Sequence, residues 1–159
     1  MKNVSKKYLE WVKSFKKSYR EARNLANVFV HDVMINNFYE LGKGLVEVEK
    51  YVKEDDAFFE SLAKDFQNDL GSSLIFSVRN LKSMKQFYKL FPENMISDID
   101  MAYIGCVAWE SIVCIINSVD GDSDKALFFI IQTVLNNWSI SVLSHELETD
   151  LYEQSKEMN

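Results

Sequence analysis

The sequence predicts an all-α protein with a single domain spanning residues 1–159. Its 159 residues, 47% of them hydrophobic, suffice for one well-filled core and are few for two domains. Five Gly and one Pro supply too few turns for the many short strands of a sandwich or barrel. Because apolar residues recur at helical spacing in several segments, we expect a compact bundle of about seven helices.

The first expected helix, at 4–34 within a basic amphipathic segment 1–35, is the most basic part of the chain. Residues 1–23 carry eight Lys/Arg and two Asp/Glu, whereas the whole chain has a net charge of −6. Apolar residues alternate at spacings of four and three, as in helices that pack along their length. This pattern fits either a bundle helix or a dimer-forming helix. The second interpretation predicts self-association through Tyr8, Trp11, Val12, Phe15 and Tyr19.

Three further helices are expected at 37–53, 56–70 and 77–91. Gly42 and Gly44 predict that the first of them is loosened. The second has large apolar residues at every fourth position, and Gly71 follows it as a C-terminal cap. The third begins at Ser77, a favourable N-cap, and ends before Pro92. Residues 56–91 are therefore predicted to form a helix-turn-helix-like unit.

The last of these helices carries four cations and no acid within residues 76–92. At 100° per residue the cations form one stripe, opposite the apolar positions. In a helix-turn-helix the second helix lies on the duplex, where Arg and Lys meet phosphates. We therefore expect DNA contacts from this stripe, assisted by the first helix: Arg79, Lys82, Lys85 and Lys89, with Lys13, Lys17 and Arg20. Asn80, at the core edge, is predicted to be structural and to hold the preceding turn.

The C-terminal helices, 96–155, are expected at 96–118, 123–137 and 139–154. Trp109 and Trp138 are predicted to lie in their core. Cys106 and Cys114 are eight residues apart on one expected helix, roughly 12 Å, which is too far for a disulfide. They are predicted to be small, unpaired core residues in a reducing compartment.

Other kinds of site are not expected. No run of about 18 apolar residues and no secretory h-region exists, which predicts a soluble cytoplasmic protein that does not bind membranes. The stretch DGDSDKALFFI lacks the glycine and the final glutamate of a calcium loop, and Thr149 replaces the second histidine of a zinc-protease helix. There is no glycine-rich phosphate loop. We therefore expect no metal, no cofactor and no catalytic residue.

Four blocks of the sequence, from about Tyr19 to Gln154, carry a family resemblance. They read FYELGKGLVEVEK, FFESLAKDFQNDL, FSVRNLKSMKQFYKLFP and VLNNWSISVLSHELETDLYEQ. In order and spacing they resemble the N-terminal domain of the YhcG-like PD-(D/E)xK nucleases, a bacterial family. The resemblance implies an all-helical, helix-turn-helix-like module that binds DNA and is followed by a nuclease domain.

The nuclease signature itself is not found in this sequence. It needs a carboxylate two residues before a lysine, and no lysine here has one. The chain also ends where the family's nuclease would begin, so nuclease activity is expected to be absent. Two functions then remain open. One is a stand-alone DNA-binding regulator or accessory of bacterial DNA processing or defence. The other is a protein-interaction module that binds or inhibits a nuclease or another nucleic-acid enzyme.

Overall fold

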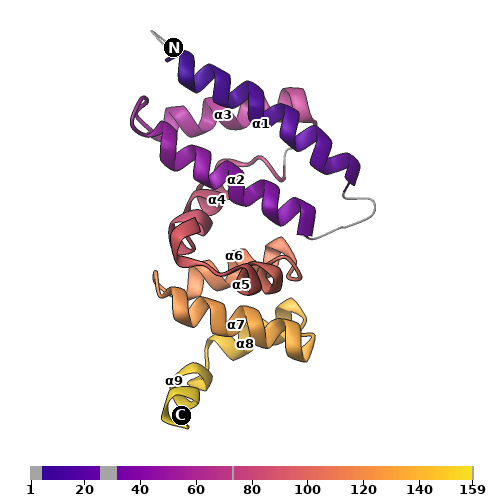
Figure 1. The fold of residues 1–159 in the computed structure, drawn as a ribbon, viewed down its shortest axis with the longest axis vertical. Coiled ribbons are helices and arrows are strands. Elements are labelled where there is room, and N and C mark those ends of the chain that lie inside the picture. Colours follow the sequence, from indigo (N-terminus) through magenta and orange to yellow (C-terminus); the bar gives the residue numbers. More distant parts are fainter. Residues whose placement is uncertain (1–4, 26–31, 73, 159) are drawn as a thin grey trace. The chain divides into compact units, whose positions relative to one another are not determined.

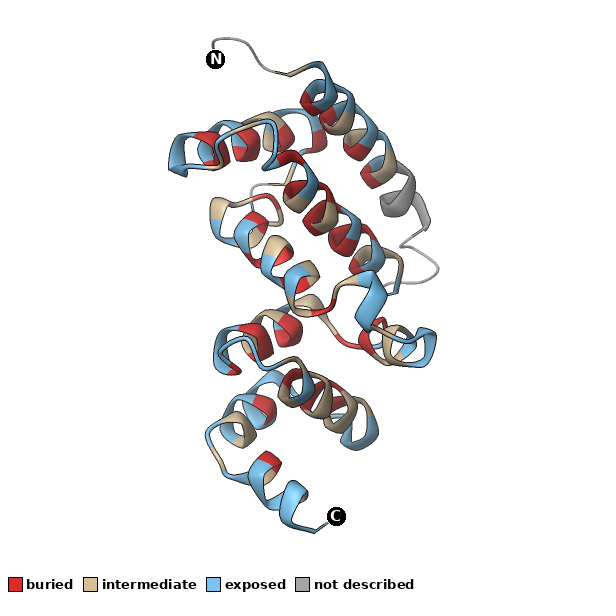
Figure 2. Ribbon diagram, turned by 60° about the vertical axis from the view of Figure 1, so that its left-hand side comes forward, coloured by how far each residue is buried: buried red, intermediate tan, exposed pale blue. Residues whose placement is uncertain are grey.

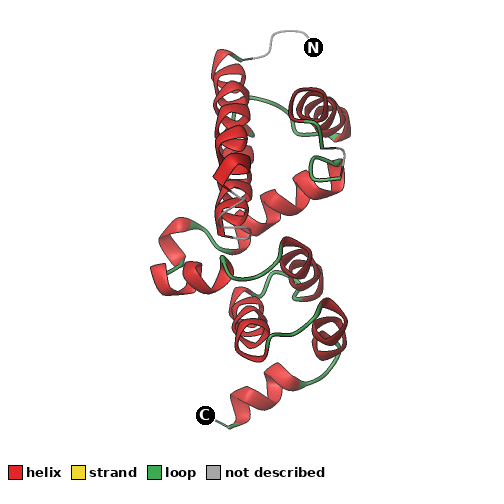
Figure 3. Ribbon diagram, turned by 90° about the vertical axis from the view of Figure 1, so that its right-hand side faces the viewer, coloured by secondary structure: helices red, strands yellow, loops and turns green. Residues whose placement is uncertain are grey.

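The computed structural model describes residues 5–25, 32–72 and 74–158, with side chains described except at 21–25. All regular structure in these ranges is helical, and they contain no strand (Figure 3). The predicted all-α class is thereby confirmed. The chain divides into two compact units, Met1–Lys89 and Leu90–Asn159, which are described separately below.

The described residues of the first unit form four helices: α1 (Lys6–Leu25), α2 (Asp32–Val48), α3 (Asp56–Leu70) and α4 (Val78–Leu90) (Figure 1). α1 packs against both α2 and α3. The helices expected at 56–70 and 77–91 are confirmed to within a residue at each end. The helix expected at 4–34 is too long, because residues 32–34 already belong to α2; residues 26–31 lie outside the described part.

The apolar stripe of α1 is buried within the unit itself. Tyr8, Val12, Phe15 and Tyr19 are all buried. The ring of Phe15 lies 5.1 Å from that of Phe66, and the ring of Tyr19 lies 4.7 Å from that of Phe76. This arrangement corrects the prediction of self-association through this stripe. Its spacing serves packing inside the chain, and these side chains are not available to a second copy.

Tyr8 gives the fold a dependence on alkaline pH. Burial, together with the negative charges of Asp65 and Glu54, raises the pKa of Tyr8 to about 12. In the unfolded chain a tyrosine ionises near pH 10, so the unfolded state loses this proton first. The contribution of Tyr8 to stability is therefore intact below about pH 10 and falls as the pH rises toward about 12.

The measurement is the free energy of unfolding of the parent and of Tyr8→Phe between about pH 9 and about pH 11.5. We expect the parent's stability to fall relative to that of Tyr8→Phe as the pH rises. Other alkaline transitions, such as loss of lysine charge, affect both proteins alike. Curves that stay parallel over this range would refute the assignment.

Gly42 and Gly44 of α2 are positions of close approach between helices. A Cβ atom on Gly42 would lie 2.0 Å from the carbonyl oxygen of Met84 in α4, and one on Gly44 would lie 1.8 Å from Nε1 of Trp11 in α1. Both glycines are buried inside regular helix. The predicted loosening of this helix is therefore wrong: the missing side chains let α4 and the half-buried Trp11 pack directly onto α2.

Two of the sequence blocks that carry the family resemblance meet at this crossing. The ring of Tyr39, from the FYELG block on α2, lies 5.4 Å from the ring of Phe87 and 5.1 Å from that of Tyr88, both from the block on α4. Gly42 belongs to the same α2 block. These two blocks thus build a packing seam between α2 and α4.

The turn between α3 and α4 is fixed by local hydrogen bonds. Gly71 adopts φ of 73°, and its N–H donates to the carbonyl of Gln67. The hydroxyl of Ser77 accepts from the N–H of Asn80 at 3.1 Å, and the side-chain amide of Asn80 donates to the carbonyl of Leu74 at 3.1 Å. The two predicted caps are confirmed, and the hydrogen bond from Asn80 to Leu74 fits the structural role of Asn80, which stays a prediction.

The second unit contains a short 3₁₀ helix η1 (Glu93–Met95) and five α-helices: α5 (Asp98–Ile104), α6 (Trp109–Ser118), α7 (Ser123–Asn136), α8 (Ile140–Leu147) and α9 (Leu151–Glu157). α7 packs against each of the other four α-helices. In each unit the buried positions gather on one side of the helices (Figure 2). The fully buried large side chains of the second unit include Phe129, Ile104 and Ile112.

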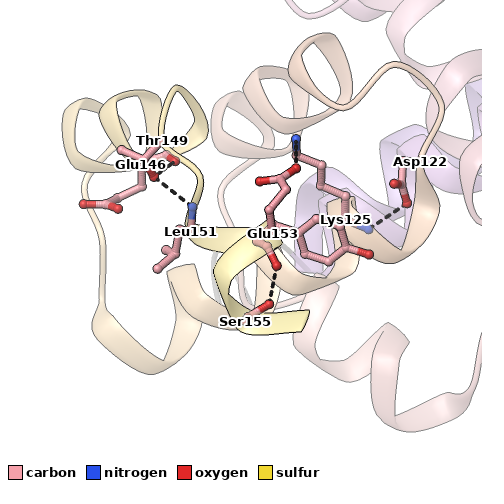
Figure 4. Close-up of polar contacts among 8 residues, drawn as sticks. Asp122, Lys125, Glu146, Thr149, Leu151, Glu153 and Ser155 are labelled. Atoms are coloured by element: carbon pink, nitrogen blue, oxygen red, sulfur yellow. Dashed lines mark hydrogen bonds and ion pairs between the residues drawn. The ribbon is translucent and has the colours of Figure 1, made fainter. Parts of the chain in front are cut away.

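Two helices expected in this unit are broken. The helix expected at 96–118 is two helices, α5 and α6, bent by 110°. The helix expected at 139–154 is interrupted at Thr149, whose hydroxyl donates to the carbonyl of Glu146 at 2.7 Å and accepts the N–H of Leu151 at 3.3 Å (Figure 4). A side chain that bonds both neighbouring turns of backbone in this way ends one helix and starts the next.

Four side chains expected in the core are less buried than predicted. Trp109 and Trp138 are half-buried, because each lies at the junction of two helices and not along a helix face. Cys106 is exposed and Cys114 is half-buried, and both are free thiols. Burial raises the pKa of the Cys114 thiol.

No single described helix has the length and apolar composition needed to cross a bilayer. α5 and α6 meet both criteria only when they are taken together across their bend.

Candidate nucleic-acid interface

The outer face of α1 carries a stripe of exposed cations. Lys13, Lys17 and Arg20 are exposed, and at 100° per residue they lie within about 60° of one another, away from the buried stripe of Tyr8. None of the three makes an ion pair with a described residue. Three predicted site residues are therefore brought together. We call Lys13, Lys17 and Arg20 the α1 stripe.

Lys16, on the side of α1 that faces α3, is paired. Its ammonium lies 2.7 Å from a carboxylate oxygen of Asp65 and 2.8 Å from one of Asp69. Burial opposes the charge of Lys16, but these hydrogen bonds outweigh it and raise the Lys16 pKa. The hydrogen bond from Lys16 lowers the pKa of Asp69. Lys16 therefore fastens α1 to α3.

An open hollow of about 380 Å³ lies beside this bridge. Two apolar residues of α1 and charged residues of α1 and α3 line it: Leu9, Val12, Lys13, Lys16, Arg20, Asp65 and Asp69. Three cations and two carboxylates leave the lining with one net positive charge.

The four cations of the stripe predicted on α4 have different surroundings in the structure. Arg79 and Lys89 are exposed and make no ion pair with a described residue. Lys82 lies 2.9 Å from Asp56 of α3 and 5.4 Å from the ring centre of Phe59. Because this ion pair is solvent-exposed, it holds Lys82 only weakly. Arg79, Lys82 and Lys89 therefore remain candidates for phosphate contacts.

Lys85 does not belong to this surface. Its side chain is only 16% exposed and donates to Glu49 at 2.7 Å and to Glu54, which is itself 5% exposed. Burial raises the pKa of Glu54, and the hydrogen bond from Lys85 lowers that of Glu49. Moving Lys85 to a phosphate would leave Glu54 buried and unpaired. This pairing disfavours the predicted DNA contact by Lys85 and makes Lys85 a structural clasp, which joins the loop after α2 to α4.

The α1 stripe and the α4 cations do not form one surface. α3 contacts α4 through Asp56 and contacts α1 through Asp65 and Asp69. On a helix, positions 65 and 69 lie about 180–220° from position 56, and the buried face of α3 lies between them. The two basic groups therefore flank α3 on opposite sides, and sequence reasoning missed this separation.

Charge is divided between the two units of the chain. Met1–Lys89 carries 16 Lys/Arg and 12 Asp/Glu, a net of +4, whereas Leu90–Asn159 carries two Lys/Arg and 12 Asp/Glu, a net of −10. All candidate phosphate contacts lie in the first unit. In the described part of the chain, no group of three His, Cys, Asp or Glu side chains is placed to hold a metal ion.

Comparison with known proteins identifies the family. No curated protein and no solved structure gives a significant match. A family model described as the DUF1016 N-terminal domain matches residues 14–154, which is nearly the whole chain. In the YhcG family this domain usually precedes a PD-(D/E)xK nuclease domain. The family predicted from the sequence blocks is thus confirmed, and the chain belongs to the DUF1016 N-terminal domain family of YhcG-like proteins.

Proposed function

We propose that this chain is a nucleic-acid-binding module without catalytic activity, and that it holds the phosphate backbone with the α1 stripe. The observation that carries the proposal is a set of three exposed cations on one helix face, none of which forms an ion pair with a described residue, in a chain whose net charge is −6. Like charges gathered on one face match the electrostatic footprint of a phosphate-binding surface, and the nearby carboxylates of Asp65 and Asp69 are hydrogen-bonded to Lys16.

The length of the stripe suits successive phosphates of one strand. Lys13 and Arg20 are seven residues apart, about 10 Å along the helix axis. A strand of B-DNA advances about 3.4 Å per base pair, so the stripe spans about three steps. One phosphate contact for each of the three cations is therefore expected.

The α4 cations provide a second, weaker surface. Arg79 and Lys89 are exposed, and the exposed pair between Lys82 and Asp56 costs little to exchange for a phosphate. Asp56, Glu49 and Glu54 nevertheless place negative charge beside this surface. We therefore assign the main contact to α1.

Family membership supports a role beside nuclease chemistry. A domain that usually precedes a nuclease is suited to hold DNA for it, and we propose the same task here, in bacterial DNA processing or defence in the cytoplasm. The protein-interaction alternative also has support in the structure, since the second unit carries a net charge of −10.

The proposal is tested with two variants of equal charge change. In the first, Lys13, Lys17 and Arg20 are replaced by Ala; in the control, Lys50, Lys53 and Lys64, exposed lysines elsewhere in the first unit, are replaced by Ala. Binding to a short DNA duplex is measured against salt concentration. The first variant should bind more weakly, and its salt slope should shrink by about 2.7, or about 0.9 for each lost phosphate contact.

The control variant should lose affinity only through its changed net charge and should keep the parent's slope. A separate variant with Arg79→Ala and Lys89→Ala measures the contribution of α4. If the α1 variant and the control bind alike at every salt concentration, the α1 stripe does not bind phosphates.

A further inference from the structure

The acidic second unit has two lysines, and both contact residues of α9. Lys125, in α7, lies 3.3 Å from Glu153 (Figure 4), and the ammonium of Lys156, in α9 itself, lies 4.4 Å from the ring centre of Tyr152. From Leu90 to Asp124 the chain has seven Asp/Glu and no Lys or Arg. No Lys or Arg within this stretch can therefore balance the negative charge of its carboxylates.

Within this stretch, η1 and the start of α5 expose large apolar side chains. Met95 is 76% exposed and Ile99 is 71% exposed. Asp98 is exposed beside them in the sequence and makes no ion pair with a described residue. We call Met95, Asp98 and Ile99 the acidic patch. Exposed apolar side chains framed by one sign of charge are typical of a protein-interaction surface.

The α1 stripe has the complementary composition. Leu9 is 56% exposed and lies about 20–40° around the helix from Arg20 and Lys13. One surface thus offers an apolar side chain among cations, and the other offers apolar side chains among carboxylates. The two surfaces are therefore opposite in charge, and each has at least one exposed apolar side chain.

We propose that the acidic patch of one copy binds the α1 stripe, with Leu9, of a second copy. Each copy carries both surfaces, so the contact is heterologous: it joins two different surfaces, and further copies can add to either end. This association differs from one through the buried side chains of α1, because it uses the opposite face of that helix. Its ion pairs are solvent-exposed, so the contact is weak and is lost when salt screens the charges.

One consequence rests on the proposed function. If nucleic acid binds the α1 stripe, it competes with the acidic patch for the same cations. Adding a short DNA duplex should then dissociate the associated copies into monomers. The self-association itself does not depend on DNA binding and can be measured without any nucleic acid.

The test is sedimentation velocity of the full chain over a range of protein concentrations, at about 25 mM and about 500 mM salt. At low salt the average sedimentation coefficient of the parent should rise with concentration; at high salt it should stay at the monomer value. Two variants, Lys13→Glu with Lys17→Glu and Asp98→Lys with Ile99→Ser, should each weaken the low-salt association at least about tenfold.

An equimolar mixture of the two variants should associate again. The unchanged acidic patch of the Lys13→Glu, Lys17→Glu variant can bind the unchanged α1 stripe of the Asp98→Lys, Ile99→Ser variant. The variant Lys64→Glu, on the exposed face of α3, is the control and should associate nearly like the parent. Circular dichroism verifies folding; if Asp98→Lys fails to fold, Ile99→Ser alone should still weaken association. A parent that is monomeric at low salt, patch variants that associate like the parent, or a mixture that stays monomeric would each overturn the proposal.

Discussion

Replacing Lys85 by Ala is expected to lower the free energy of unfolding by about 3 kcal/mol, the range for removing one partner of a buried ion pair. Lys85 is the cation that holds both Glu49 and Glu54, and Glu54 is 5% exposed. The Oε1 atom of Glu54 has no hydrogen-bond partner among the described residues. Without Lys85, the Glu54 carboxylate would therefore have little to compensate for its burial. Chemical denaturation of the parent and the variant measures the difference.

The matched control is Lys89→Ala, one turn further along α4. Lys89 is exposed and makes no ion pair with a described residue, so its loss should change stability by no more than about 0.5 kcal/mol. Adding Glu54→Gln to Lys85→Ala should recover part of the loss, because the stranded charge is removed. Equal stabilities of Lys85→Ala and Lys89→Ala would show that the clasp contributes nothing.

Replacing Gly42 by Ala is expected to destabilise the first unit by about 2–3 kcal/mol, as overpacking does in a filled core. The new methyl group would meet the Met84 carbonyl at 2.0 Å, and a backbone atom inside a helix has no room to retreat. In an ordinary helix interior the same change would stabilise by roughly 1 kcal/mol, so the sign of the effect identifies the close crossing.

Gly44→Ala is the comparison variant for the crossing. Its new methyl group meets the indole of Trp11, and a half-buried side chain can rotate outward where a backbone carbonyl cannot. We therefore expect a smaller loss of stability than for Gly42→Ala. Thermal melts of both variants decide the matter, and an increase in stability for Gly42→Ala would contradict the close packing of α2 and α4.

The helices that were predicted well are those whose ends carry local signals. α3 has large apolar residues at every fourth position and a glycine in left-handed conformation after it, and α4 starts after the hydroxyl cap of Ser77. The prediction missed a helix break where the apolar spacing continues through a bend. Apolar residues flank the turn at Gly105 on both sides, so their periodicity alone joins α5 and α6 into one helix.

The candidate site could be predicted only in part, because charge pairing is not local. Lys85 and Lys89 belong to the same sequence stripe, yet Lys85 sits at its inner edge and meets carboxylates 36 and 31 residues earlier in the chain. No spacing within α4 indicates those partners. The α1 cations were predictable because Lys13, Lys17 and Arg20 are opposite a strong apolar stripe, which fixes them at the surface.

The most direct test of the proposed function is the affinity of the parent protein for a short DNA duplex across a series of salt concentrations. Binding at low salt, with log K falling linearly in log salt at a slope of about −2.7 or steeper, is the expected result for three or more phosphate contacts. Absence of binding at low salt, or an affinity that does not change with salt, would contradict phosphate recognition by α1.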